Sequence, residues 1–177
     1  MAIRFNFFVG CRVGELVALK WTDIVNRNHL HICREEIKDS VRIDGTWKDV
    51  YTVVDHTKTN KDRIVPLAPD AVNILSEVRK VRGYLFDEED FIFMRGENRI
   101  TSRQVNYALE KACTSLGMTV KRSHKIRKTV ASRLYAGDVP LDFIREMLGH
   151  AELSTTLGYI FNPLSEEETY NLITKAL

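Results

Sequence analysis

The chain has 177 residues, of which 44% are hydrophobic and 28% charged, and its formal net charge is +2. These proportions are typical of a globular protein and exclude a disordered, collagen-like or coiled-coil chain as an overall description. No stretch approaches the roughly 20 apolar residues of a membrane span, and the first residues are too short and too polar a run for a signal peptide. The length fits one domain, or one domain with an appendage.

The first half of the sequence predicts two helices followed by short strands. Residues 2–8 are mostly apolar and Gly10 ends them, while residues 14–21 predict a second helix. Residues 29–36 and 50–56 are rich in β-branched side chains and predict strands. A third short strand covers residues 63–67, where Pro66 indicates a sheet edge or the end of the strand.

The second half predicts helices alone. One begins at Pro69, one covers residues 102–116, and one begins with Ser123 as N-cap and runs through Tyr135. Another begins at Pro140 and ends at Gly149. A short helix from residue 154 and a last one from about residue 165 complete the chain. The fold class is therefore α+β and mostly helical.

The three cysteines, Cys11, Cys33 and Cys113, are odd in number and form no C-x-x-C pair. This pattern predicts a protein of the reducing cytoplasm without a zinc site.

Charge is distributed unevenly along the chain. The segment from Asp138 onward carries seven acids against two bases, a net charge of −5, so the first 137 residues carry +7. One short stretch without any acid holds Lys121, Arg122, Lys125, Arg127, Lys128 and Arg133. Such a stretch suits a polyanionic partner, although a solvated helix face gives the same pattern.

Several residues are candidates for phosphate chemistry. His124 and Arg127 lie three positions apart, so they share one helix face and can hold an anionic oxygen. Arg12 lies between two glycines before a helix, where a guanidinium and the backbone can approach a phosphate. Lys58 lies in the polar turn between the second and third predicted strands. A surface role without chemistry remains the alternative for each of them.

Two further candidates follow near the end of the chain. His150 comes directly after the glycine that ends a helix, and Tyr159 follows nine residues later. A positioned tyrosine that loses its proton is a nucleophile. The alternatives are a histidine with a packing role and a tyrosine whose ring lies in the core.

Taken together, these residues resemble the catalytic domain of the tyrosine recombinases, the phage integrase family. The resemblance rests on Gly10-Cys11-Arg12-Val13-Gly14-Glu15-Leu16 with Trp21, on Lys58-Thr59 with Arg63-Ile64-Val65-Pro66, on His124-Lys125-Ile126-Arg127, and on Leu148-Gly149-His150 with Tyr159. All parts occur in the family's order and cover residues 10–159. Within the family, the chain is similar to the integrases of phages and mobile elements.

The resemblance implies a mostly helical α+β domain with a small three-stranded antiparallel sheet. It also implies site-specific DNA cleavage and rejoining through a 3′-phosphotyrosyl intermediate. Tyr159 would attack the phosphate while Arg12 and Arg127 neutralise its non-bridging oxygens. Lys58 would be the general acid, His124 the acid/base partner of Tyr159, and His150 a hydrogen-bond donor to the phosphate.

The resemblance implies neither a metal ion nor another cofactor. The expected partners are double-stranded DNA recombination sites and further protomers, as a tetramer on DNA and a monomer in its absence, without a membrane. Lys121, Arg122, Lys125 and Lys128 are the predicted DNA-binding residues.

The sequence departs from the family pattern at a few positions. Cys11 stands where leucine is common, Lys125 and Lys128 stand where an acid and a histidine are common, and Gly158 precedes the nucleophile. Family members also carry helices and DNA-binding domains ahead of the first arginine. We therefore expect a catalytic domain over residues 1–162 that is truncated at its front and binds DNA weakly by itself.

The acidic end of the chain predicts a tail helix within residues 163–177. In the family this segment often docks on a neighbouring protomer, and Leu172, Ile173 and Leu177 would form that contact. Packing against its own domain is the alternative.

Two other functions remain open on sequence grounds. A metal-dependent nuclease would use Asp87, Glu88, Glu89 and Asp90, although consecutive acids in a loop are typical of a solvated run. A DNA-binding remnant of an integrase without catalysis is the second.

Overall fold

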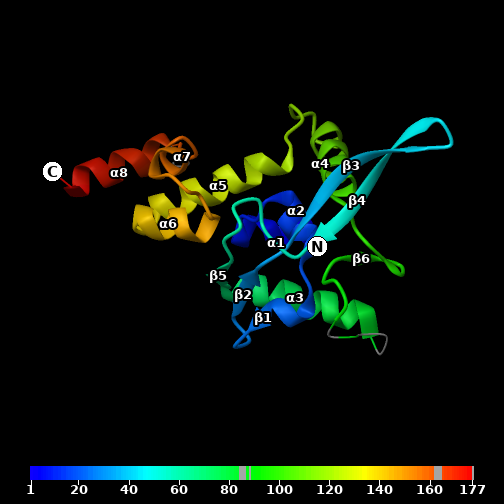
Figure 1. The fold of residues 1–177 in the computed structure, drawn as a ribbon. Coiled ribbons are helices and arrows are strands. Elements are labelled where there is room, and N and C mark those ends of the chain that lie inside the picture. The colour runs from blue at the N-terminus through cyan, green and yellow to red at the C-terminus, as the bar shows by residue number, and fades with distance from the viewer. Residues whose placement is uncertain (84–86, 88, 162–164, 177) are drawn as a thin grey trace.

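The computed structural model describes residues 1–83, 87, 89–161 and 165–176, and Figure 1 shows their arrangement. Two short helices open the chain, α1 (Ala2–Val9) and α2 (Val13–Ala18), followed by a 3₁₀ turn over Trp21–Asp23. The longer helices are α3 (Pro69–Arg82), α4 (Ser102–Ser115) and α5 (Ser123–Ala136). The shorter ones after them are α6 (Leu141–Leu148) and α7 (Leu153–Leu157), and α8 (Glu166–Ala176) lies at the C-terminal end.

The predicted fold class is confirmed, because a three-stranded antiparallel sheet stands among these helices. Its strands are β1 (Ile24–Val25), β2 (His29–Ile32) and β5 (Arg63–Pro66), in the order β1-β2-β5. Leu30 lies opposite Val65, and both side chains are fully buried. Pro66 ends an edge strand, as expected for a residue that cannot donate to the sheet.

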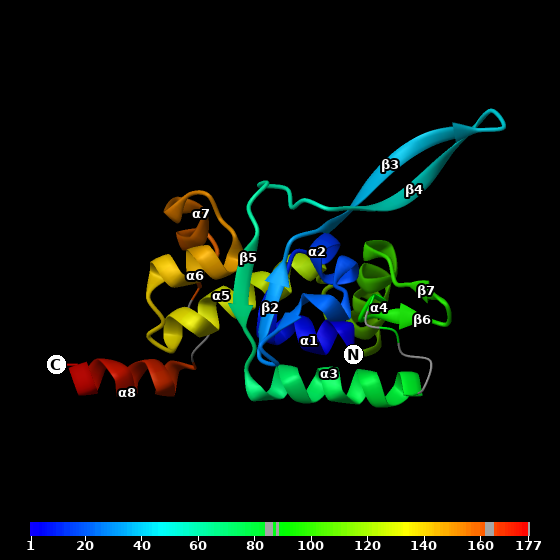
Figure 2. The ribbon, with the colours of Figure 1, turned by 60° about the horizontal axis from the view of Figure 1, so that its bottom comes forward.

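One of the strands predicted for this sheet belongs to a different one. Residues 50–56 do not join it; residues up to Val54 belong to β4 (Thr46–Val54), which pairs with β3 (Glu35–Ile43) in a separate ribbon. The turn of this ribbon is Asp44-Gly45, and both residues have positive φ. An Asp-Gly pair between β-branched runs favours such a two-residue turn. The ribbon projects from the body (Figure 2).

A short pair of strands completes the sheet structure. It consists of β6 (Met94–Arg95) and β7 (Asn98–Arg99), which pair with each other just before α4.

The main core lies where α1, α2, α3 and α4 pack around the sheet. Phe5, Leu16, Leu30 and Ile92 are fully buried in it. A second, smaller cluster joins α5 to α6 through Ala131, Ile144 and Leu148, with the Tyr159 ring packed against it. Burial of apolar area of this kind is the main stabilising term for the fold.

The ends of the helices place the chain for the site. Gly10, after α1, and Gly149, after α6, both adopt the left-handed conformation that ends a helix. The predicted helix over residues 14–21 ends at Ala18, because Leu19 is extended. Arg122, not Ser123, is the N-cap of α5, and the Ser123 N–H donates to Asn106 Oδ1 of α4 at 3.1 Å.

The ribbon and α8 project from opposite sides of the body in both views (Figures 1 and 2). No described residue of α8 is buried, and Leu172 and Ile173 are exposed. Leu177, also predicted to form the tail contact, lies outside the described residues. No helix in the described ranges is long and apolar enough to cross a membrane.

Candidate active site

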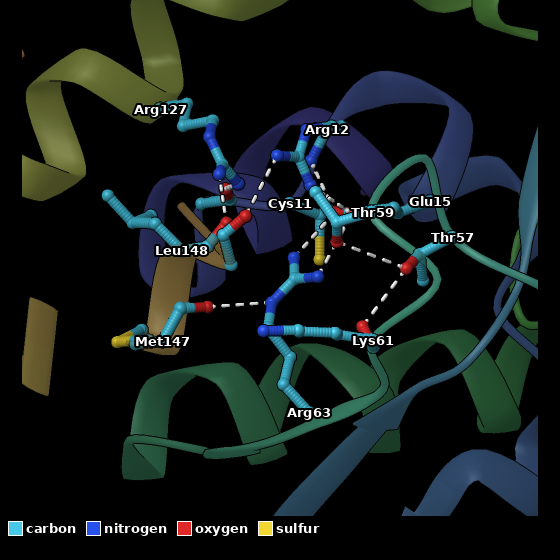
Figure 3. A network of polar contacts seen from close by, with 12 residues as sticks. Cys11, Arg12, Glu15, Thr57, Thr59, Lys61, Arg63, Arg127, Met147 and Leu148 are labelled. Atoms are coloured by element: carbon cyan, nitrogen blue, oxygen red, sulfur yellow. Dashed lines mark hydrogen bonds and ion pairs between the residues drawn. The ribbon is translucent and has the colours of Figure 1, made fainter. Parts of the chain in front are cut away.

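Two predicted arginines and one predicted histidine meet where the α1–α2 turn, α5 and the end of α6 come together. Arg12 Nη2 donates to the Gly149 carbonyl oxygen at 3.0 Å, over a separation of 137 residues. Arg127 Nη1 donates to the Gly10 carbonyl oxygen at 2.8 Å, and its Nη2 donates to the Leu148 carbonyl oxygen. Figure 3 shows both guanidiniums and Leu148 within one polar network. His150 follows Leu148 by two residues and therefore lies near the same two arginines.

Arg127 is the largest fully buried side chain in the described part of the protein. Burial, followed by the nearby charge of Arg12, lowers its pKa to about 10. The guanidinium therefore remains charged at neutral pH. Within the described ranges, its Nε has no hydrogen-bond partner, which leaves a buried donor free for an anionic ligand.

His150 is buried and faces the same arginines. Its Nδ1 lies 3.0 Å from Thr156 Oγ1, while its Nε2 has no partner among the described residues. Burial, then the charges of Arg127 and Arg12, lower the pKa of His150 to about 4. The ring is therefore neutral at pH 7, and a proton on Nε2 makes that atom a donor.

Tyr159 lies directly beside both predicted histidines. Its ring centroid is 4.6 Å from that of His150 and 5.0 Å from that of His124, with both pairs edge to face. The structure thus places the proposed nucleophile next to His150, whose buried Nε2 has no partner among the described residues.

His124 is exposed at the start of α5, and its ring lies edge to face with that of Tyr159. Burial, then the charges of Lys128 and Arg127, lower the pKa of His124 below its ordinary value of 6.5. An unprotonated imidazole at neutral pH is suited to accept a proton.

Lys58 is the one predicted catalytic residue that the structure does not join to the others. It is exposed in the turn between β4 and β5, which do not pair, so the turn is a connection and not a hairpin. The turn is closed by the Asn60 N–H, which donates to the Thr57 carbonyl oxygen at 2.8 Å. Within the described ranges, no hydrogen bond or ion pair links Lys58 to the other five residues.

The predicted DNA-binding residues fall into two groups. Lys121, Arg122 and Lys125 are exposed around the start of α5. Lys128 is half-buried, and its Nζ donates to the Gly158 carbonyl oxygen at 3.2 Å and lies 5.1 Å from the centre of the Tyr159 ring.

Sequence reasoning assigned no role to Glu15 and Arg63, which connect the site. Glu15 Oε1 accepts from Arg12 Nη1 at 2.8 Å and from Arg63 Nη1 at 3.0 Å, and its Oε2 accepts from Arg63 Nη2 at 2.6 Å. Arg63 Nε donates to the Met147 carbonyl oxygen at 2.8 Å. The pair therefore ties α2, β5 and the end of α6 together (Figure 3).

The Glu15 carboxylate is fully buried and charged. Burial alone would raise its pKa, but the hydrogen bonds and charge of Arg63, followed by the charge of Arg12, lower it below 4.5. The sequence does carry one signal for Glu15. It is the single acid within residues 10–19, directly before the apolar residues 16–19. The residues near it in the sequence do not indicate which basic side chain pairs with it.

The acidic run considered for a metal is partly paired with bases. Glu89 binds Lys20 at 3.2 Å, and Asp90 forms an ion pair with Arg82. Glu88 lies outside the described residues. In the ranges that the structure describes, no group of three or more His, Cys, Asp or Glu side chains is placed to hold a metal ion.

The sequence model of the phage integrase family matches residues 1–163. The chain therefore belongs to the phage integrase family, and the predicted resemblance is confirmed.

Individual relatives agree with this assignment. The tyrosine recombinase XerC of Thermodesulfovibrio yellowstonii is 39% identical over 159 residues, which are 85% of this chain and 45% of the relative. The XerC of Corynebacterium glutamicum is 31% identical over 176 residues, 98% of this chain and 49% of the relative. The chain thus spans about half the length of the curated relatives it matches.

Solved structures show the same fold. The XerA recombinase superposes with a TM-score of 0.70 at 21% identity and covers 99% of this chain and 55% of its own. The Tn1549 transposon integrase reaches a TM-score of 0.73 at 17% identity, over 99% of this chain and 57% of its own.

Proposed function

We propose that this chain is the catalytic part of a site-specific tyrosine recombinase that integrates or excises DNA. The observation that carries the proposal is the buried, unpartnered Nε2 of His150, which lies beside the Tyr159 ring and near the charge of Arg127, whose own Nε is also buried and unpartnered among the described residues. Buried polar groups normally have partners, and an anionic phosphate with several oxygens is a suitable one. Residues 1–162 would form the catalytic domain, and 163–177 a tail.

Cleavage would couple the exchange of one phosphorus–oxygen bond to two proton transfers. Tyr159 Oη attacks the phosphorus, its proton passes to His124, and the bond from phosphorus to the 5′-oxygen breaks. Lys58 gives a proton to that oxygen, so the products are a 3′-phosphotyrosyl link and a 5′-hydroxyl. Arg12, Arg127 and His150 stabilise the charge on the non-bridging oxygens. A different 5′-hydroxyl reverses the step and completes strand exchange, without a metal ion.

Known proteins support DNA and further protomers as partners. The Tn1549 transposon integrase was solved with circular intermediate DNA, and a lambda integrase fragment as a dimer bound to a core site. We infer double-stranded recombination sites, a tetramer on DNA and a monomer without it, acting in the cytoplasm. The exposed Leu172 and Ile173 of α8 support a tail contact with a neighbouring protomer.

The test uses a library of labelled DNA duplexes with one nick inside a randomised stretch. Cleavage beside the nick releases a short fragment and traps the covalent protein–DNA adduct, which also reports the preferred sequence. We expect an adduct from the wild-type chain and none from Tyr159→Phe. An adduct that persists in Tyr159→Phe would refute the nucleophile.

The same assay separates the two alternatives. Strand cleavage that EDTA abolishes, without a covalent adduct, would indicate a metal-dependent nuclease. DNA binding without cleavage or adduct would indicate a catalytically inactive integrase remnant.

A further inference from the structure

The chain segment around Tyr159 is bound to α5 through its backbone. Lys128 Nζ donates to the Gly158 carbonyl oxygen at 3.2 Å, and Ser132 Oγ donates to the Tyr159 carbonyl oxygen at 3.2 Å. The Phe161 N–H in turn donates to Ser132 Oγ at 3.0 Å. Three residues of one short segment are therefore held by two side chains of a single helix.

These side chains belong to one face of α5. His124, Lys128 and Ser132 are four residues apart, so they lie above one another along the helix. His124 contacts the Tyr159 ring by its edge, and Ser132 is fully buried beneath the segment. Lys128 stands between them and is the only one of the three that contacts both the ring of Tyr159 and the backbone before it.

The charge of Lys128 is directed at the tyrosine. Among the described residues no carboxylate pairs with its ammonium, which lies 5.1 Å from the ring centre. The titratable groups that face this ring are Lys128 and His124 from α5 and His150 from the turn after α6. None of them is an acid. The Lys128 ammonium is therefore attracted to the electron-rich ring, and these surroundings favour negative charge on the tyrosine.

The backbone bond matters because of Gly158. A glycine has more backbone freedom than any other residue, so the conformation next to the nucleophile depends on the contacts that Gly158 makes. Here its carbonyl oxygen is fixed by a charged donor, and charge-assisted hydrogen bonds are the stronger kind. Lys128 and Gly158, which both depart from the family pattern, are thus in direct contact.

We propose that Lys128 is a positioning residue that holds Gly158 and the Tyr159 ring in the orientation for attack. The proposal rests on the recombinase function proposed above. It assigns Lys128 to the nucleophile and not to a DNA phosphate, whereas Lys121, Arg122 and Lys125 remain free for phosphates.

The test separates DNA affinity from the rate of attack. The substrate is the nicked duplex recovered from the library, and two quantities are measured. These are the Kd for DNA, by fluorescence anisotropy, and the single-turnover rate of adduct formation at saturating protein. For Lys128→Met we expect the rate at saturation to fall about 10- to 100-fold, as for other misplaced reacting groups, with Kd changed less than about twofold.

Three variants complete the design. Lys128→Arg keeps a charged donor and should restore the rate to within about threefold of wild type. Lys125→Met, one turn earlier on α5, should weaken Kd instead, because it removes an exposed phosphate-binding charge. Lys111→Met removes an ammonium that also lies 5.1 Å over a tyrosine ring, Tyr107 on α4, and should change neither quantity.

Two results would overturn the proposal. One is a Lys128→Met protein with the wild-type rate at saturation and a weaker Kd, which would make Lys128 a phosphate contact. The other is a Lys128→Arg protein as slow as Lys128→Met. A wild-type chain that forms no adduct at all would instead refute the recombinase function, and this proposal with it.

Discussion

The buried carboxylate of Glu15 provides the sharpest test of how the site is held together. Glu15→Gln keeps the size and shape of the side chain but removes its charge. It also replaces one acceptor oxygen with an NH₂ group that faces guanidinium donors. In the wild-type chain the two oxygens accept four hydrogen bonds, two from Arg12 and two from Arg63.

The expected loss of stability is large. Arg63 has only 8% of its side chain exposed, so Glu15→Gln leaves a buried guanidinium without its counter-charge. Breaking a buried pair on one side costs about 3–5 kcal/mol, out of the 5–15 kcal/mol that is typical of a whole domain. Urea unfolding should therefore show a much lower midpoint with an unchanged slope.

A matched control is available at the surface. Arg4 and Glu77 form an exposed pair at 3.5 Å, and Glu77→Gln should cost less than about 1 kcal/mol. A Glu15→Gln protein within about 1 kcal/mol of wild type would refute the reasoning, because the buried pair would then contribute no more than an exposed one.

The pH dependence follows from the same group. The folded protein holds the pKa of Glu15 below 4.5, so its contribution is complete above that pH and is lost as pH falls through the lower folded value. The difference in stability between wild type and Glu15→Gln should therefore shrink in acid. A constant difference down to the acid transition would contradict this assignment.

Three further predictions follow from other parts of the site. Lys58→Ala should slow cleavage by about 10²–10⁴-fold, and a substrate with a 5′-bridging sulfur, which leaves without a proton, should restore the rate if Lys58 is the general acid. His150 has a pKa of about 4 in the folded chain, against an ordinary value of 6.5, so the unfolded chain binds more protons between these two values. The free energy of unfolding should therefore rise with pH in this range, and His150→Gln should remove that rise in urea titrations. Gly149 has φ +62°, and a Cβ there would lie 3.0 Å from Arg63 Nη1, so Gly149→Ala should cost about 1–3 kcal/mol, and more than Gly117→Ala, where φ is +65° and no atom lies within 4 Å.

Local signals in the sequence were sufficient for most elements and for the order of the candidate residues. Gly10 and Gly149 end helices because a residue without a side chain tolerates the left-handed conformation. Each of these helix ends can therefore be predicted from one residue alone. Helices α3 to α6 follow from apolar periodicity in the same way. The Asp44-Gly45 pair also predicts a two-residue turn, and this signal would have been sufficient to predict the β3–β4 ribbon, which the strand prediction above does not contain.

Contacts between distant segments were decided only by the tertiary structure. The Glu15–Arg63 pair spans 48 residues, the bond from Arg63 to Met147 spans 84, and that from Arg12 to Gly149 spans 137. Whether a buried charge finds a partner depends on which backbones pack together, and no short stretch of sequence contains that information. Lys128 shows the same limit, because its place in a basic stretch gives no sign that its ammonium lies 5.1 Å from the centre of the Tyr159 ring and donates to the Gly158 carbonyl oxygen.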